Sequence, residues 1–522
     1  MQSANTPRFW TGTAVSSAIV LLIATLFYLI WRQKGTLVEH PLDVAHLLRM
    51  SALQAGLTTF LSLLVGAALA WALNRIHFPG RALLVGLLSA ALVTPGIVVA
   101  IGLISIWGRA GWLNSALSVL GLQTGSIFGL QGILYAHVIL NATFAAAVLL
   151  AHLDALPANR LKLGQNLRFS AWRRFQTLDW PVLRSTLPGL GAIIFLLAFT
   201  SFPIVLTLGG GPANQTFEIA IYTAIRIDFD LRTAVFLALV QLSICTFLII
   251  PASVFALSPP GSGITKTIIW RDPQMARIIQ KAIIIVSTIG LGAPLVSVLL
   301  DGLSVGPLLS TPQFWQALGT SLIIGLGSAL TTIFLSTVIS MASISTRKKF
   351  FRTLIVIPSY IYLAVPGVTL SLGFFLGART LGILPERAAP IVLVIANALL
   401  ALPFALAILV PIFNASTQRY GRLCTSLCLS NWARFRWVEW PMMGREIGLV
   451  FAMGFCFSLG DLSIIALFGT ETFSTLPWLM YRALGAYRTH DAAALAAILL
   501  LVSTLSFQIL PRVIERMSRA GT

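Results

Sequence analysis

The stretch WRRFQTLDWP (Trp172–Pro181) recurs as WARFRWVEWP (Trp432–Pro441), 260 residues further along the chain. The two Trp, the Phe and the Pro all keep this displacement. Each copy lies between two long apolar runs, in a chain that is 57% hydrophobic and 10% charged. Because a soluble domain carries about 25% charged residues, this composition predicts an integral membrane protein. The repeated stretch predicts that the protein consists of two related halves.

Twelve apolar runs are long enough to cross a bilayer, since a spanning helix needs about 20 such residues. The first run is too long for a signal-peptide core and lacks a small-residue cleavage site, so it is retained as a helix. We therefore expect an all-α membrane protein with about 12 transmembrane helices. The expected spans are 10–31, 51–73, 82–107, 132–153, 187–208, 233–256, 278–300, 320–343, 351–376, 388–413, 447–468 and 492–511.

The loop charges indicate the orientation, because Lys and Arg concentrate in cytoplasmic loops. With the N-terminus inside, about two thirds of the 35 Lys and Arg residues fall in the inner segments. This predicts that both termini and both copies of the repeated stretch are cytoplasmic. A net charge of +19 can also indicate nucleic-acid binding. Here the basic residues are scattered between apolar runs, so membrane topology explains the charge and no nucleic acid is expected.

An even number of helices in each half gives the two copies the same orientation. The halves are then parallel repeats of six helices, related by an axis along the membrane normal. We expect a first half at 1–256, a cytoplasmic linker at 257–277 and a second half at 278–522.

The chain shows no recognisable catalytic, metal or nucleotide site. The linker stretch Gly261–Thr267 resembles a phosphate loop, but Thr265 stands where that loop needs a Gly before Lys266. The four cysteines complete no metal set with nearby histidines. We therefore expect a non-catalytic protein without a cofactor of its own, whose driving energy comes from another molecule.

The two cytoplasmic loops that contain the repeated stretch are the candidate binding sites for the molecule that supplies this energy. In each, a Trp and a Phe at positions i and i+3 share one helical face and suit a buried interface. The flanking Arg residues could pair with an acidic rim or with lipid phosphate, and the closing Trp-Pro should end the helix. The alternative is an interfacial helix with Trp at headgroup level. The candidate coupling residues are Trp172, Arg173, Arg174, Phe175, Trp180, Pro181, Trp432, Arg434, Phe435, Trp440 and Pro441.

The repeated stretch resembles the cytoplasmic loop signature of binding-protein-dependent ABC transporter permeases. That signature runs Glu-Ala-Ala, three residues, Gly, and later a hydrophobic residue and Leu-Pro. Aligned on the first Trp of each copy, its acidic start falls on Lys162 and Arg422, and its Gly on Arg168 and Cys428. The resemblance implies a fold like that of type I ABC importer permeases, and it adds these four residues to the candidate ATPase contacts.

A narrower resemblance to thiamine ABC transporter permeases covers most of the first half. It rests on Phe78–Arg81, Gly108–Leu113, Gly129–Leu134, Leu208–Pro212, Glu218–Tyr222 and Asp228–Asp230. It implies import of thiamine or its phosphate esters across a bacterial inner membrane. A periplasmic binding protein would deliver the solute, and a separate cytoplasmic ATPase homodimer would use ATP and Mg.

Two alternatives remain. Fused ABC permeases for ferric iron or another small solute share the architecture implied by the resemblance. A secondary transporter driven by an ion gradient belongs to a different class and would need coupling carboxylates within its spans. Among the acidic residues, only Asp461 qualifies for that role.

Asp461 is the acidic residue expected within a span, and Ser201 takes the same place in the first half. A carboxylate at a helix centre costs about 2.5–3.5 kcal/mol on insertion scales, so it should face a partner or a wet cavity. Asp461 could line the pathway and favour a cationic solute, or cap a helix break. We expect Glu218, Asp228 and Asp230 in or near an outer loop, where they could dock the binding protein or be solvated.

Matching breaks in the two halves also point to the pathway. Pro95 and Pro366 interrupt corresponding spans, and such proline breaks can line a cavity or serve only as packing kinks. Asn141 and Asn397 occupy similar places in their spans. They are weaker pathway candidates, because a buried Asn can also join helices by hydrogen bonds.

Overall fold

The computed structural model describes residues 7–32, 43–109, 111–122, 125–254, 270, 272–303, 306–346, 348–362 and 365–520. Within these ranges the regular structure is helical and contains no strand, so the expected all-α membrane class is confirmed. Ten of the described helices are long and apolar enough to cross a membrane, and three apolar segments are shorter. The expected twelve spans agree with this set. Residues 257–269 of the predicted linker, including the stretch Gly261–Thr267, lie outside the described residues.

The chain forms two compact units, each of which draws on both sequence halves. Unit 1 comprises Met1–Leu42, Phe217–Thr246 and Val305–Thr522, and unit 2 comprises Asp43–Thr216 and Phe247–Ser304. The division at 1–256, 257–277 and 278–522 concerns the sequence repeat and stays a prediction. In space, the first helix of each half belongs to the unit built mainly from the other half.

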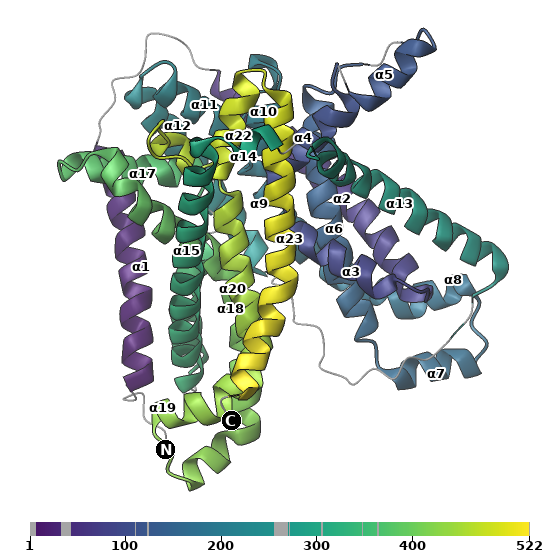
Figure 1. The fold of residues 1–522 in the computed structure, drawn as a ribbon. Helices are drawn as coiled ribbons and strands as arrows, with labels where there is room; N and C mark the ends of the chain where they lie inside the picture. Colours follow the sequence, from purple (N-terminus) through teal and green to yellow (C-terminus); the bar gives the residue numbers. More distant parts are fainter. Residues whose placement is uncertain are drawn as a thin grey trace. The chain divides into compact units, whose positions relative to one another are not determined.

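Unit 2 is built around α2, which packs along α6 and α9 (Figure 1). Two expected spans are broken. Span 82–107 becomes α3 and α4, separated at Pro95, and span 187–208 becomes α9 and α10. The helices are α2 (Val44–Arg75), α3 (Arg81–Ala90), α4 (Gly96–Trp107), α5 (Trp112–Val119), α6 (Leu130–Asp154), α7 (Ala158–Asn166), α8 (Ala171–Arg174), α9 (Trp180–Phe199), α10 (Pro203–Leu208) and α13 (Gln274–Asp301).

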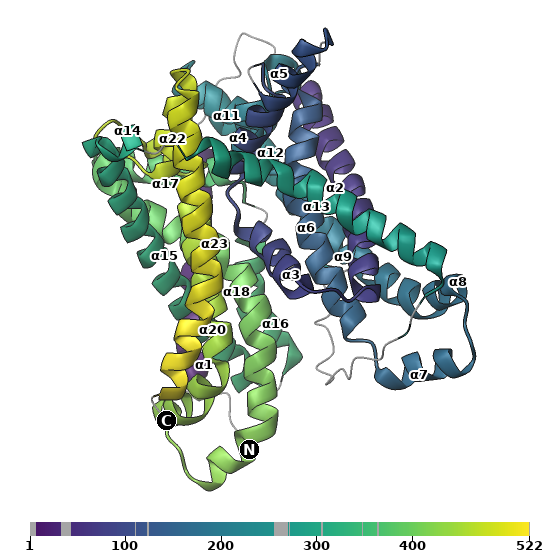
Figure 2. The ribbon, with the colours of Figure 1, turned by 45° about the vertical axis from the view of Figure 1, so that its right-hand side comes forward.

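Unit 1 repeats this plan around α15, which packs along α18 and α20 (Figure 2). Span 351–376 is broken near Pro366, and span 447–468 is broken at Asp461. The helices are α1 (Pro7–Arg32), α11 (Phe217–Arg226), α12 (Leu231–Val254, which runs on into unit 2), α14 (Gly306–Leu309), α15 (Pro312–Ser345), α16 (Lys349–Ile361), α17 (Gly367–Thr380), α18 (Pro385–Ser426), α19 (Asn431–Arg434), α20 (Trp440–Gly460), α21 (Ile465–Phe468), α22 (Leu476–Gly485) and α23 (Thr489–Ala520).

The exchanged helices α1 and α13 are held by close backbone approach at small residues. In unit 1, a Cβ added at Gly12 of α1 would lie 2.1 Å from the Cβ of Ala342 on α15. In unit 2, a Cβ added at Gly102 of α4 would lie 2.1 Å from the carbonyl oxygen of Pro294 on α13. Small residues at such crossings let membrane helices pack without a side chain between them. The exchange is therefore a tightly packed feature of both units.

Both chain ends lie beside α19 in unit 1. Arg8, in the first turn of α1, forms an ion pair with Glu439 at 3.0 Å. Near the other end, Ser518 of α23 packs against Gly444 at the start of α20. Figure 1 marks both ends close to α19. The second copy of the repeated stretch and the two ends of the chain therefore share one end of the unit.

Candidate functional site

The two copies of the repeated stretch have the same backbone conformation. In each, a Ser N-cap accepts a hydrogen bond from the backbone N–H three residues later, at 3.3 Å for Ser170 and 3.2 Å for Ser430. One helical turn follows, then a five-residue π-helical turn, Phe175–Asp179 or Phe435–Glu439. We call each stretch from the Ser to the following Trp-Pro a coupling segment.

The π-helical turn explains how a helix accommodates the Trp-Pro pair. The N–H of Trp180 bonds to the carbonyl of Phe175, five residues back, directly before Pro181, which has no N–H to donate. The second segment repeats this pattern at Trp440. The expectation that Trp-Pro ends the helix was wrong. Pro181 and Pro441 are the second residues of α9 and α20, directly after the π-helical turn that accommodates the missing donor.

Each coupling segment places an exposed indole, Trp172 or Trp432, over a partly buried phenyl ring, and a second indole, Trp180 or Trp437, is also exposed. The rings of Trp172 and Phe175 stack with centroids 5.7 Å apart, and those of Trp432 and Phe435 lie 5.8 Å apart. The shared helical face expected from the i, i+3 spacing is confirmed. The exposed fractions of the two Trp residues are 66% and 68%. Trp180 and Trp440 lie near the same Phe rings, with ring centroids 6.2 Å and 6.3 Å apart.

The candidate basic residues in and before the segments divide into two groups. Lys162, Arg173 and Arg422 are exposed and could meet a partner. Arg174 and Arg434 are engaged within the chain: Arg174 pairs with Asp272 at 3.3 Å, and Arg434 pairs with Glu439 at 2.7 Å. These two residues therefore have acidic partners within the chain, and pairing of the flanking Arg residues with a partner or with lipid stays a prediction.

Arg168 and Cys428 end the helices that precede the coupling segments, in a left-handed conformation with φ of 50° and 48°. Each closes a Schellman-type helix end, in which Gly is the favoured residue because it has no Cβ. This conformation accounts for the Gly of the signature that these residues replace. The closing hydrogen bonds run from Phe169 N–H to Gly164 O and from Leu429 N–H to Cys424 O, both 3.1 Å.

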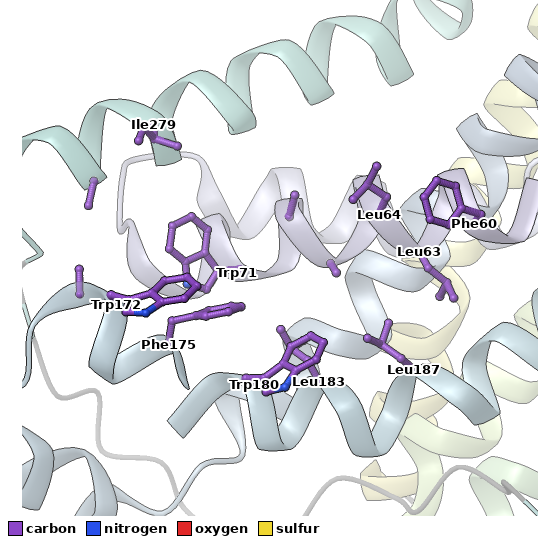
Figure 3. A pocket seen from close by; sticks show the side chains of 14 residues that line it. Phe60, Leu63, Leu64, Trp71, Trp172, Phe175, Trp180, Leu183, Leu187 and Ile279 are labelled. Carbon is purple, nitrogen blue, oxygen red and sulfur yellow. The ribbon is translucent and has the colours of Figure 1, made fainter. Parts of the chain in front are cut away.

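The first coupling segment lies over an apolar cavity of about 680 Å³ in unit 2 (Figure 3). Trp172, Phe175 and Trp180 form one wall, and Trp71 of α2 meets the ring of Phe175 edge-on at 6.2 Å. Beneath the second segment, the corresponding space in unit 1 contains a packed core. Its central residues are Ala405, Leu409, Phe413, Met443, Ile447 and Val450.

The pathway candidates of unit 1 gather at its two helix breaks. Asp461 follows α20, and its Oδ1 accepts hydrogen bonds from the N–H groups of Ser463 (3.0 Å) and Ile464 (3.3 Å) at the start of α21. Its Oδ2 is buried and has no hydrogen-bond partner among the described residues. Asn397 Nδ2 donates to Ser458 Oγ, three residues before Asp461, at 3.2 Å.

The second break lies next to the first. Pro366 is the N-cap of α17, and a Cβ added at the following Gly367 would lie 2.8 Å from the Cβ of Ser463. Asp461, Asn397 and Pro366 therefore belong to one region of unit 1.

Unit 2 repeats the breaks without a carboxylate. Pro95 is the N-cap of α4, and a Cβ added at Gly96 would lie 3.1 Å from the side chain of Ile204 in α10. Ser201 lies between α9 and α10, at the place of Asp461. Asn141 is buried on α6. Pro95 thus lies at the break before α4, Ser201 lies at the break between α9 and α10, and α4 and α10 pack against each other next to these breaks.

No protein-family model matches the chain. The thiamine transport system permease protein of Salmonella typhimurium is 38% identical over 478 residues, covering 90% of this chain and 88% of the relative. That of Escherichia coli is 35% identical over 515 residues, covering 96% of each. That of Haemophilus influenzae is 37% identical over 478 residues, covering 88% of this chain and 87% of the relative. The chain belongs to the family of thiamine transport system permease proteins.

A more distant match supports the transporter class only. The molybdenum transport system permease protein of Azotobacter vinelandii is 28% identical over 183 residues, which are 35% of this chain and 79% of that relative. Together with the apolar helices, the family establishes the permease as a multi-pass protein of the inner membrane.

Of the three acidic residues expected in or near an outer loop of the permease, Asp228 is exposed and Asp230 lies in the turn before α12, whereas Glu218 is enclosed. Glu218 is fully buried, and accepts hydrogen bonds from the N–H of Val368 (3.2 Å) and from Gln241 (3.4 Å). It therefore caps α17 at the break after Pro366, and the expectation of an outer-loop residue was wrong. Asp230 accepts hydrogen bonds from Thr233 at the start of α12, which lower the pKa of its carboxyl group. No signal in the sequence distinguished these carboxylates from solvated ones.

The left-handed helix end generates a stability prediction. Cys428→Gly should raise the free energy of unfolding by up to about 1 kcal/mol, because Gly adopts φ of 48° without a Cβ clash. The matched control is Ser426→Gly in the last turn of α18, where Gly should lower stability by about 0.5–1 kcal/mol. Thermal unfolding of the purified permease in detergent measures both. Equal shifts for the two variants would contradict a strained conformation at Cys428.

Proposed function

We propose that this permease is the membrane subunit of an ATP-driven ABC importer that moves thiamine or its phosphate esters from periplasm to cytoplasm. The main support is the match to thiamine permeases over nearly the whole chain, at 35–38% identity. The repeated coupling segments add independent support, because an ATPase dimer with two equivalent subunits needs two equivalent docking sites on the permease.

The partners in this proposal are a periplasmic binding protein and a cytoplasmic ATPase homodimer. The binding protein delivers the solute to the outer face. Each ATPase subunit binds ATP and Mg, and each binds one coupling segment of the permease. The permease itself performs no chemistry. Closure of the ATPase dimer would move the coupling segments and switch access to the pathway from one side of the membrane to the other.

Both termini lie in the cytoplasm in this proposal. The concentration of Lys and Arg in the predicted inner segments supports this orientation. The positions of both chain ends beside α19 are consistent with it, because the second coupling segment must also face the cytoplasmic ATPase.

Uptake of labelled thiamine tests which solute the permease transports. Proteoliposomes that contain the permease, its ATPase and its binding protein should accumulate thiamine only when ATP is inside and the binding protein is outside. Uptake of ferric iron or another ion in place of thiamine would support the alternative ABC permease. Accumulation that follows an ion gradient without ATP would support a secondary transporter.

The exposed indoles are the proposed ATPase anchors. Trp172→Ala or Trp432→Ala should weaken ATPase binding by about 2 kcal/mol or more, which is over tenfold in Kd, because each removes a large aromatic contact from the interface. Titration of ATPase onto nanodiscs containing the permease measures the Kd. These single changes leave Phe175 and Phe435, which pack inward, in place.

Trp315→Ala is the matched control for the anchors. Trp315 is a similarly exposed indole near the start of α15. Met341, near the opposite end of that helix, packs with the core beneath the second coupling segment. Trp315 therefore lies at the end of α15 that is away from the segment. The control should leave the Kd unchanged. An unchanged Kd in both anchor variants would refute docking through these indoles.

Asp461 is the proposed electrostatic determinant for the thiamine cation. One oxygen of its carboxylate caps α21, while the other is buried without a partner among the described residues and remains able to meet a cation. The neutral Ser201 takes the same place in the first repeat. Pro95, Pro366, Asn141 and Asn397 mark the helix breaks and buried amides that would border the same pathway.

Asp461→Asn separates the two roles, because the Asn side-chain oxygen can still cap α21 while the charge is lost. We expect thiamine uptake to fall at least about tenfold, a loss of about 1.4 kcal/mol, with normal amounts of permease in the membrane. Ser201→Ala is the control in the other repeat and should have a smaller effect. Normal uptake by a well-folded Asp461→Asn protein would leave Asp461 with a structural role alone.

A further inference from the structure

The second coupling segment is bound to the start of α1 by two Arg residues that surround one buried carboxylate. Glu439, the last residue of the π-helical turn, is fully buried. Its Oε1 accepts from Arg434 at 2.7 Å and from Arg8 of α1 at 3.0 Å. Arg8 also donates to the backbone carbonyl of Asn431, the first residue of α19. One side chain of α1 therefore contacts both ends of the segment.

The first coupling segment is bound to the start of α13 by a different group. Arg174 Nη1 pairs with Asp272 Oδ1 at 3.3 Å, and its guanidinium stacks over the ring of Trp270 at 4.2 Å. Gln280, in α13, donates to the other oxygen of Asp272 at 2.8 Å. The segment's own acid, Asp179, pairs with Arg75 at the end of α2.

The two groups of contacts join corresponding parts of the two units, but the charged residues that form them differ. In each unit a residue at the start of the exchanged helix reaches the coupling segment of the opposite sequence half. The exchanged chain supplies a cation in unit 1, where Arg8 meets Glu439, and an anion in unit 2, where Asp272 meets Arg174. In both units, therefore, a charged residue at the start of the exchanged helix pairs with the coupling segment, although the pairs lie at different positions of the repeat.

We propose that Arg8 and Asp272 are positioning residues that bind each coupling segment to the first helix of the opposite half, so that the two move as one body during transport. This inference rests on the proposed function. A buried ion pair is costly to break, because each partner left alone would be a buried charge. A displacement of the coupling segment is therefore transmitted to α1 or α13.

The exchanged helices lead from the coupling segments to the helix breaks. In unit 1, Leu26 of α1 packs against Gly373 of α17, the helix that begins after Pro366. In unit 2, Ser297 of α13 donates to the carbonyl of Gly102, in the helix that begins after Pro95, at 3.1 Å. The ionic junctions thus connect an ATPase contact to a candidate pathway break within each unit.

The first test measures thiamine transported per ATP hydrolysed, in proteoliposomes with ATPase and binding protein. Arg8→Gln and Asp272→Asn should each lower this ratio at least about fivefold, the lower end of usual coupling strengths. Membrane amounts and ATPase binding should stay normal. Arg8→Lys should restore part of the ratio. The control, Arg277→Gln, removes an exposed charge from the first turn of α13 and should leave the ratio unchanged.

An unchanged ratio in both variants would overturn the proposal, as would a loss of ATPase binding in proportion to transport, which would indicate a purely structural contact. These outcomes are distinct from failure of the proposed function. In that case the wild-type permease itself would not move thiamine.

A covalent bridge gives a second test, in which the ion pair is replaced rather than only removed. Arg8→Cys and Asn431→Cys, combined with Cys428→Ser to remove an exposed native thiol, place one thiol on α1 and one on α19. The contact spans the length of the Arg8 side chain, so a bifunctional maleimide is used in place of a disulfide. If the segment and α1 move as one body, cross-linking should raise transport per ATP above that of the same protein before cross-linking. No increase, or a loss of the remaining transport, would overturn the proposal.

Discussion

Within a bilayer, an unpaired backbone N–H or C=O group costs several kcal/mol, so a spanning helix can break only where other groups replace its lost hydrogen bonds. Both breaks in unit 1 meet this condition with a carboxylate. Glu218 accepts from the N–H of Val368 at the start of α17, and Asp461 accepts from the N–H groups that begin α21. The interruptions of the spans, and hence the candidate pathway, depend on these acceptors.

The same constraint shapes the coupling segments. A proline directly after the second Trp shared by both copies removes a donor, and the π-helical turn moves the preceding hydrogen bond back by one residue. As a result the exposed Trp, the inward Phe and the second Trp follow one another along a continuous helix. The helix continues into α9 or α20, so a force applied at the segment acts directly on a spanning helix.

The two repeats are more similar in backbone conformation than in the contacts that their side chains make. Both have the Ser cap, the π-helical turn and the left-handed helix end, yet one segment lies over an apolar cavity and the other over a packed core. A carboxylate at one break corresponds to Ser201 at the other. The duplicated sequence thus preserves the backbone of the coupling segments, while the side chains at the helix breaks and beneath the segments differ.

The sequence by itself determined the membrane class, the approximate number of spans and the aromatic face of each coupling segment. These follow from apolar run length and helical spacing, which are local properties of the chain. Only the tertiary structure decided that Arg174 and Arg434 turn inward, that Glu218 caps α17, and that α1 and α13 exchange between the units. Several of these contacts join residues far apart in the sequence: Asp272 lies 98 residues from Arg174, and Arg8 lies 431 residues from Glu439. No local pattern identifies which distant charge will neutralise a buried one.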